Sequence, residues 1–203
     1  MTTGEDPATK AFYADKWAAV AEVEKEIGSS PQLGPFLDDL TPGAAVLELG
    51  CGGGRDSKAI LAAGFELDAT DGCEQLVRQA RAHLGHAVRL MRFAELDAQA
   101  RYHGVWASAC LLHVLRDDLV GILHLIHRAL RPDGLFFASY KAGSGEGRDQ
   151  YGRYFNYPDI AWLDETYRKA GDWASIDIET GPGLQHGGAE VAWHRVTAKR
   201  QEA

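Results

Sequence analysis

The feature that most constrains this chain is an apolar run that ends in a cluster of glycines. The run covers residues 44–49, and a helical pattern begins near Arg55. The glycines between them are Gly50, Gly52, Gly53 and Gly54. Glycine lets a backbone approach a ligand closely, and the free N–H groups of a first helical turn favour an anionic group. The sequence therefore predicts a ligand-binding unit of strand, glycine turn and helix.

Two common nucleotide motifs do not fit this turn. In the dinucleotide fingerprint G-x-G-x-x-G, counted from Gly50, the third glycine falls at position 55, which is Arg55. The P-loop pattern G-x-x-x-x-G-K-[ST] occurs nowhere in the chain. The pattern that does fit is an acidic residue, Glu48, followed by a glycine at every second position.

A second acid stands at the end of the next expected strand. Asp71 lies 21 residues after Gly50, the distance at which a carboxylate grips a ribose in nucleotide-binding α/β folds. A carboxylate accepts hydrogen bonds from two adjacent hydroxyls. The alternative is that Asp71 only caps the helix that follows it.

The segment at residues 50–56, G-C-G-G-G-R-D, resembles motif I of the class I S-adenosylmethionine (AdoMet)-dependent methyltransferases. It is most similar to that of small bacterial members with G-C-G-x-G-R-D. L-L-H at 111–113 and L-R-P-D-G at 130–134 resemble further segments of this family. The resemblance covers about residues 10–199. It implies an enzyme that transfers a methyl group from AdoMet to a small-molecule acceptor by in-line displacement.

Strands and helices alternate along the chain, which predicts an α/β fold with a Rossmann-like, doubly wound sheet. The expected strands are 44–50, 65–70, 88–93, 104–110, 134–140, 173–179 and 190–198. The last two are joined by a loop without a helix, so they should pair antiparallel. The resemblance implies the strand order 3-2-1-4-5-7-6 with strand seven antiparallel.

The length of 203 residues and a 45% hydrophobic content favour one domain, residues 1–203. Residues 10–40 are expected to form an N-terminal helical cap, because apolar residues recur there every three or four positions. This stripe consists of Tyr13, Trp17, Val20, Val23 and Ile27. Residues 142–158 mix glycines, aromatics and arginines. They are interpreted as a water-excluding lid or, alternatively, as a solvated loop with packing aromatics.

The composition argues against several classes of partner. A formal charge of −8 without a basic run disfavours nucleic acids and anionic membranes, and no apolar stretch approaches the ~20 residues of a membrane span. The three cysteines lack metal-ligand spacing, and their odd number suggests reduced thiols in the cytoplasm. Neither these cysteines nor the i, i+3 pair His124 and His127 predicts a metal site.

Two alternatives to a small-molecule methyltransferase stay open. One is an AdoMet-binding module without transfer activity. The other is a methyltransferase of protein or RNA, which the acidic charge and the lack of a recognition domain disfavour. Nothing in the sequence indicates an oligomeric state.

The resemblance implies a set of cofactor contacts. Gly50, Cys51, Gly52 and Gly53 would pass beneath the amino-acid and ribose parts of AdoMet, and Asp71 and Gly72 would bind the ribose. Arg55 would pair with the methionine carboxylate or else be a solvated helix residue. Tyr13 would close over the ligand, and Cys110 and Leu111 would line the sulfonium. At the adenine, either Phe93 and Ala94 make the contact or Glu95 supplies the acid.

The acceptor is expected to meet Tyr13, His113, Tyr140, Arg153 and Tyr154. His113 follows the end of a central strand, where ligands bind in open α/β sheets. It is interpreted either as a general base or hydrogen-bond donor, or as a histidine of the pocket wall. Arg153, flanked by Tyr151 and Tyr154, has the chemistry to hold an anionic or planar group.

Overall fold

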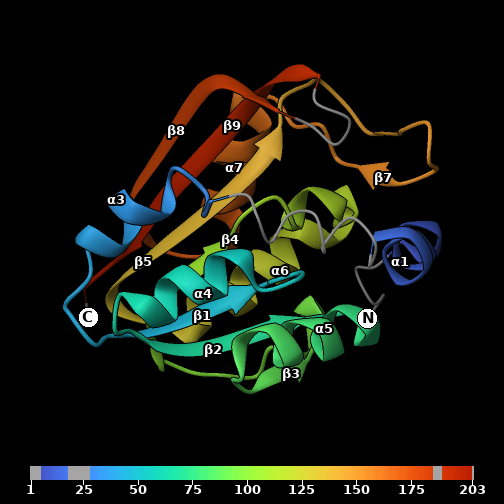
Figure 1. The fold of residues 1–203 in the computed structure, drawn as a ribbon. Coiled ribbons are helices and arrows are strands. Elements are labelled where there is room, and N and C mark those ends of the chain that lie inside the picture. Colours follow the sequence, from blue (N-terminus) through green and yellow to red (C-terminus); the bar gives the residue numbers. More distant parts are fainter. Residues whose placement is uncertain (1–5, 18–27, 185–188, 203) are drawn as a thin grey trace.

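The structure, a computed structural model, describes residues 6–17, 28–184 and 189–202 and is built around a seven-stranded sheet (Figure 1). In sheet order its strands are β3 (Val88–Leu90), β2 (Glu66–Asp71), β1 (Ala45–Leu49), β4 (Tyr102–Ala107), β5 (Leu130–Lys141), β9 (Glu190–Arg200) and β8 (Trp173–Leu184). The first five are parallel, and β9 runs antiparallel to both β5 and β8. When only these seven strands are numbered along the chain, without β6 and β7, the order is 3-2-1-4-5-7-6. The predicted fold class is confirmed.

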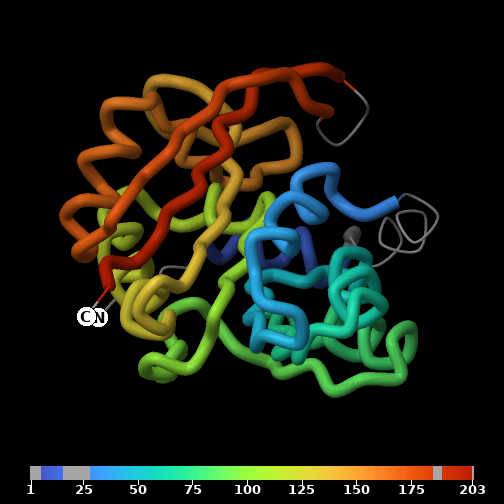
Figure 2. The backbone as a smooth tube through the Cα atoms, turned by 90° about the vertical axis from the view of Figure 1, so that its left-hand side faces the viewer, coloured from blue at the N-terminus to red at the C-terminus, as the bar shows by residue number. Residues whose placement is uncertain are grey.

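Helices cover both faces of the sheet (Figure 2). One face carries α3 (Leu33–Asp38), α4 (Arg55–Ala62) and α5 (Glu74–Leu84), and the other carries α6 (Arg116–Ala129) and α7 (Ile160–Ala170). In the part of the chain that the structure describes, no helix has the length and apolar character needed to cross a membrane.

The sheet has a hydrophobic core on each face, and the central strands send successive side chains into one core and then the other. On β5, Phe136 stacks with Tyr167 of α7 at 5.8 Å between ring centroids. Its neighbour Phe137 stacks on Trp106 at 4.2 Å, on the face of α3. Because successive strand residues point to opposite faces, a nearly continuous apolar run provides apolar side chains on both faces of a sheet that helices cover on both sides.

Two strands end earlier than expected because a 3₁₀ turn takes over. The third stops at Leu90, and Phe93–Glu95 (η2) form a turn whose N-terminus is capped by Glu95, which accepts a hydrogen bond from the N–H of Arg92 at 2.8 Å. The fourth stops at Ala107, before the turn Leu111–His113 (η3). Both turns lie at the carboxyl edge of the sheet.

The N-terminal cap begins with α1 (Pro7–Phe12) and continues as a π-helical segment, η1 (Tyr13–Trp17). Val20, Val23 and Ile27 of the predicted stripe lie outside the described residues. The expected lid contains β6 (Gly147–Arg148) and β7 (Tyr154–Phe155), which pair antiparallel. Figure 1 shows α1 and β7 on the same side of the molecule, beyond the carboxyl ends of the parallel strands.

The glycine turn after β1 uses the conformations that only glycine adopts easily. Gly50, Gly52 and Gly54 have φ values of +66°, +56° and +87°. A Cβ added to Gly50 would lie 2.6 Å from the Cβ of Cys110, whereas one added to Gly52 would meet nothing within 4 Å. The first glycine is thus required by a close approach, and the second faces open space.

This contrast predicts unequal effects for two matched substitutions. Gly52→Ala should cost only the strain of a left-handed residue, about 1–2 kcal/mol. Gly50→Ala carries the same strain and also displaces Cys110, which adds about 1–3 kcal/mol. Urea unfolding of the two variants measures the difference, and equal losses of stability would show that the contact with Cys110 is unimportant.

Candidate functional site

Four segments meet at the carboxyl edge of the parallel strands (Figure 1). They are the glycine turn, the end of β2, the turn η3, and the N-terminal cap together with the hairpin formed by β6 and β7. This edge is where open α/β sheets bind ligands. The predicted site residues can be placed segment by segment.

Asp71 joins two of these segments. Its side chain is buried at 8% exposure. One carboxylate oxygen accepts the N–H of Gly52 at 2.9 Å, and the other accepts the N–H of Cys73 at 2.8 Å. Gly72 lies inside the short turn that the second bond closes. The carboxylate thus holds both the glycine turn and the residue that precedes α5, but it does not cap α5, whose N-terminus has no side-chain cap.

The glycine turn has the properties of a ligand cradle. Gly52 leaves room above the backbone that any Cβ would occupy, and Gly53 and Gly54 lead directly into α4. Arg55 at the start of α4 is half-buried, and its Nε donates to Asp56 at 3.0 Å. The turn and Asp71 together suit a ligand with a sugar and an anionic group.

The two cysteines near the turn are buried, neutral thiols. Burial raises the pKa of Cys51 and of Cys110, with the negative charges of Glu48 and Asp71 adding to the effect. The Sγ of Cys110 donates to the carbonyl of Leu49 at 3.2 Å. Neither thiol is therefore suited to act as a nucleophile.

Leu111 and the η2 residues have structural roles of their own in the fold. The side chain of Leu111 is fully buried in the core on the α6 face. Phe93 is half-buried against that same core, Ala94 is exposed, and the exposed Glu95 caps its own turn. The structure thus gives Glu95 a local structural partner, and the choice between these residues at an adenine stays a prediction.

Tyr13 and His113 are brought together from positions 100 residues apart. The Tyr13 hydroxyl lies 2.8 Å from Nε2 of His113, and Nδ1 lies 2.6 Å from the carbonyl oxygen of Tyr154. A carbonyl only accepts, so Nδ1 carries the proton and Nε2 accepts from Tyr13. The tautomer of His113 is set by the hairpin.

Burial keeps both members of this pair neutral. It lowers the pKa of His113 to about 4, and the charges of Arg153 and Lys141 act in the same direction. Burial raises the pKa of Tyr13 to about 12, although the Arg153 guanidinium opposes this shift. Between pH 6 and 8 neither side chain changes its charge.

Arg153 is buried, and a carboxylate is already beside it. Its side chain is paired with Asp149 at 2.7 Å and lies over the ring of Phe12 at 4.6 Å. It also hydrogen-bonds to Tyr13, which lowers the pKa of that hydroxyl. Arg153 therefore links the hairpin to the cap and does not stand as an exposed anion receptor.

Two predicted acceptor contacts take other roles. Tyr140 is wrong as a substrate residue, because it is fully buried and its hydroxyl lies 3.1 Å from that of Tyr167 in the core. The hydroxyl of Tyr154 donates to Glu146 at 2.6 Å, and the hydroxyl oxygen accepts the N–H of Arg116 at 3.2 Å. Tyr154 reaches the site through its carbonyl.

The histidines of α6 have structural partners. Nδ1 of His124 lies 3.0 Å from the carbonyl of Ala170, and Nε2 of His127 lies 3.0 Å from that of Asp172. Within residues 6–17, 28–184 and 189–202, no group of three potential ligands could hold a metal ion.

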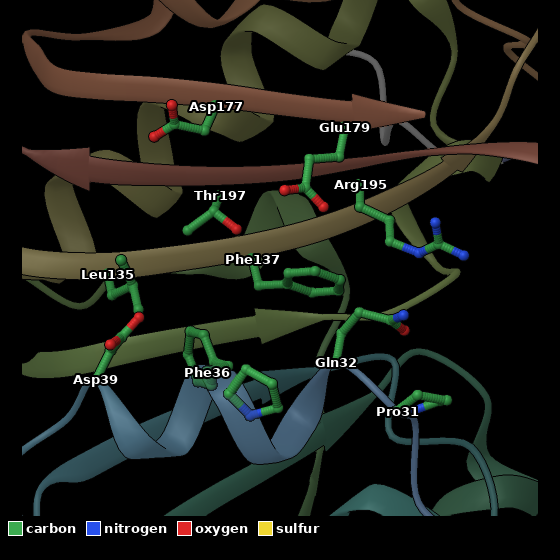
Figure 3. Close-up of a pocket in the computed structure, with 11 residues that line it drawn as sticks. Pro31, Gln32, Phe36, Asp39, Leu135, Phe137, Asp177, Glu179, Arg195 and Thr197 are labelled. Atoms are coloured by element: carbon green, nitrogen blue, oxygen red, sulfur yellow. The ribbon is translucent and has the colours of Figure 1, made fainter. Parts of the chain in front are cut away.

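A cavity of about 310 Å³ lies elsewhere, on the sheet face next to α3 (Figure 3). Phe36 and Phe137 form part of its wall, and Asp177, Glu179 and Arg195 of β8 and β9 stand over it. None of its lining residues belongs to the predicted site. It is separate from the glycine turn, which lies at the carboxyl edge.

Sequence reasoning missed three contributors. Asp149 precedes Arg153 by four residues, a spacing that could have signalled an ion pair. Asp6 pairs with Arg148 at 2.6 Å, and the hydroxyl of Thr9 accepts the N–H of Tyr154 at 2.8 Å. These last contacts join positions more than 140 residues apart, for which no local pattern exists.

Glu48, the acid before the glycines, is buried beneath the turn and hydrogen-bonded to the hydroxyl of Ser57. Burial raises its pKa from 4.5 to about 8, and the nearby charge of Asp56 adds to the shift. The folded protein therefore holds this proton more tightly than the unfolded chain does. The resulting stabilisation is fully present below pH 4.5 and is lost as the pH rises through 8.

Glu48→Gln should remove this pH dependence. Glutamine keeps an acceptor for Ser57 without a charge, so the variant should gain on the order of 3 kcal/mol over the wild type as the pH rises from 5 to 8. Thermal unfolding across this range measures the gain. Glu66→Gln, at an exposed carboxylate on β2, is the control, and parallel curves for wild type and Glu48→Gln would contradict the prediction.

Comparison with known proteins supports the resemblance seen in the sequence. Residues 46–134 match the family described as a methyltransferase domain. The ubiquinone biosynthesis O-methyltransferase of Xanthomonas campestris pv. campestris is 30% identical over 105 residues, which cover 48% of this chain and 43% of that protein. Its counterpart in Xanthomonas oryzae pv. oryzae is 30% identical over 160 residues, covering 68% of this chain and 66% of that protein. The chain thus spans less than two thirds of the length of either relative.

Solved structures extend the comparison to nearly the whole chain. The 1,6-didemethyltoxoflavin-N1-methyltransferase of Burkholderia thailandensis, with bound 1,6-didemethyltoxoflavin and S-adenosylhomocysteine, superposes with a TM-score of 0.76 at 21% identity, covering 96% of this chain and 88% of that one. At this identity the likeness shows the fold. Residues 46–134 therefore match a methyltransferase domain, and the chain has the Rossmann-like fold of the class I methyltransferases.

Proposed function

We propose that this protein is an AdoMet-dependent methyltransferase that acts on a small molecule. The observation that carries the proposal is the joining of the glycine turn to Asp71 at the carboxyl edge of a sheet with the methyltransferase strand order. Relatives named as O-methyltransferases of ubiquinone biosynthesis support a small acceptor.

The chain's own residues fit the cofactor. Asp71 would hold the ribose hydroxyls, the turn from Gly50 to Gly53 would pass beneath the ligand, and Arg55 would face its carboxylate. When bound, AdoMet supplies an electrophilic methyl group on a sulfonium. Cys110, which lies against Gly50, would form the adjoining wall as a neutral thiol.

The Tyr13–His113 pair is proposed to orient the acceptor. The pKa of Tyr13 is raised to about 12 and that of His113 is lowered to about 4, so the neutral forms of both side chains are favoured. Full transfer is therefore unfavourable, and the proton stays on Tyr13. The Tyr13 oxygen, while donating to His113, can accept a hydrogen bond from the hydroxyl or amine of an acceptor. Positioning a nucleophile in line can by itself supply ~7–11 kcal/mol of rate enhancement.

The cap and the hairpin would exclude water from this reaction. Both contribute buried contacts around Tyr13 and His113. The net charge of −8 favours a small acceptor over RNA, and the three cysteines are free thiols, as the reducing cytoplasm predicted from the sequence would keep them. An AdoMet-binding module without transfer activity would bind the cofactor and release no S-adenosylhomocysteine with any acceptor.

Asp71→Asn tests the cofactor assignment. The amide keeps an acceptor but loses the charge, so the affinity for AdoMet in calorimetric titration should fall at least about tenfold, with no signal for NAD in either protein. Asp68→Asn, on the same strand and paired with Arg89, is the matched control and should bind AdoMet as the wild type does. The proposal would be wrong if the wild type bound no AdoMet at millimolar concentration.

The state of His113 gives a second test that needs no acceptor. In ¹⁵N NMR of labelled histidine, His113 should remain the neutral Nδ1–H tautomer from pH 8 down to about 5.5, because its pKa is about 4. Tyr13→Phe should shift the Nε2 signal by removing its donor while leaving Nδ1–H in place. Titration of His113 near pH 6.5, or an Nε2–H tautomer, would contradict the orienting role.

A further inference from the structure

The turn that carries His113 is held by a buried side chain from the segment after β7. Asn156 directly follows this strand and is 0% exposed. Its Nδ2 donates to the carbonyl of Leu111 at 3.0 Å and to that of Val114 at 3.2 Å. Its backbone N–H donates to the carbonyl of Leu112 at 2.9 Å. Asn156 therefore binds the backbone on both sides of His113.

Three consecutive residues of this segment act on His113. The carbonyl of Tyr154 accepts from Nδ1 at 2.6 Å, and the ring centroid of Phe155 lies 4.5 Å from that of the imidazole. Asn156 makes the third attachment, through the backbone of η3. The segment is itself fixed by Arg116 at the start of α6, whose Nη1 donates to the carbonyl of Asn156 at 2.9 Å. The imidazole and its backbone are thus positioned by one short piece of chain.

The hydrogen bonds of Asn156 show which property of its side chain is used. A side-chain amide offers two N–H donors on one atom, which neither leucine nor an ionised aspartate supplies. The structure places Nδ2 on two carbonyls of the His113 turn. Oδ1, in contrast, is buried and has no hydrogen-bond partner among the described residues. Because a buried unpaired acceptor costs stability, the two donors are what an asparagine contributes at this position.

The direction of the hydrogen bonds around His113 matters for the proposed transfer. While Nδ1 carries the proton, Nε2 accepts from the Tyr13 hydroxyl at 2.8 Å. The Tyr13 oxygen can then accept from the hydroxyl or amine of an acceptor. In the other tautomer Nε2 would donate to Tyr13, whose hydroxyl would donate to the acceptor and occupy the lone pair that attacks the methyl group.

We propose that Asn156 is a positioning residue of the methyl transfer, which holds η3 so that His113 keeps the Nδ1–H tautomer and turns Nε2 toward Tyr13. This inference rests on the proposed function and adds a residue to its site. Asn156 acts through His113 and not on the acceptor itself. Loss of its two donors would let η3 shift relative to Tyr154, so that Nδ1 would no longer be paired exclusively with that carbonyl.

Asn156→Leu is the main test, because leucine has a similar shape and carries neither a donor nor a charge. In ¹⁵N NMR of labelled histidine at neutral pH, the wild type should show His113 as Nδ1–H. In the variant the ratio of Nδ1–H to Nε2–H should fall at least about tenfold. An unchanged tautomer in the folded variant would overturn the inference.

Thr166→Val is the matched control. Thr166 of α7 is 3% exposed, and its hydroxyl donates to the carbonyl of Trp162 at 2.6 Å. The control variant therefore also loses a buried hydrogen bond with little change of shape, and it should keep the tautomer of the wild type. If both variants changed the tautomer equally, general loosening would be the cause and the inference would be wrong.

A measurement on the wild type covers the case in which Asn156→Leu does not fold. Asn156 is the sole asparagine of the chain, so ¹⁵N labelling of asparagine gives one assigned side-chain amide. Its protons should exchange with solvent at least about a hundredfold more slowly than those of free asparagine. Asn156→Ser, which keeps one donor, should give an intermediate tautomer ratio. Rapid exchange, or the wild-type ratio in the serine variant, would contradict the proposed hold on His113.

Titration with S-adenosylhomocysteine separates this inference from the proposed function. Asn156→Leu should bind it within about threefold of the wild type, because the cofactor is proposed to lie at the glycine turn. A larger loss would show that Asn156 serves the cofactor and would overturn the inference alone. Failure of the wild type to bind S-adenosylhomocysteine would instead refute the proposed function, and with it any role of Asn156 in a transfer.

Discussion

The carboxylate of Asp71 is the interaction on which the site depends. It holds backbone N–H groups of both the glycine turn and the α5 start, so it fixes the ends of two neighbouring strands relative to each other. Without it, those two N–H groups would lose their partner in a nearly buried position. The two oxygens of a carboxylate can together accept about four hydrogen bonds. Holding the two turns and binding a ribose are therefore compatible roles, and the first places the carboxylate for the proposed second.

The sheet could be predicted from the sequence because its information is local. Apolar runs, glycine stops and the spacing from Gly50 to Asp71 lie within a few tens of residues. The alternation of elements indicated the fold class, whereas the order of the strands was implied by the family resemblance. The error at Tyr140 was avoidable on the same grounds, since Phe136, Ala138 and Tyr140 share one strand face. The contacts of the cap with the hairpin, such as that of Asp6 with Arg148, join residues that are far apart in the sequence. No local sequence pattern indicates such contacts.

These long-range contacts make the cap and the hairpin one structural unit. Asp6 and Thr9 bind β6 and β7 through an ion pair and a hydrogen bond, and Phe12 lies against Arg153. The hairpin is in turn held to η3 by Asn156, whose side chain donates to the carbonyls of Leu111 and Val114. Tyr13 thus reaches His113 from a cap that these contacts hold against the hairpin. The proposed orienting pair depends on these long-range contacts as well as on the sheet.

The charges of the site are divided along its length. At the turn, Glu48 is largely protonated near neutral pH because its pKa is about 8, and the neighbouring Asp71 is the carboxylate proposed to hold the ribose of the cofactor. In the middle, Tyr13 and His113 are neutral. Beyond them, Arg153 is paired with Asp149. In the proposed reaction the methyl group would therefore pass beside the neutral Tyr13–His113 pair.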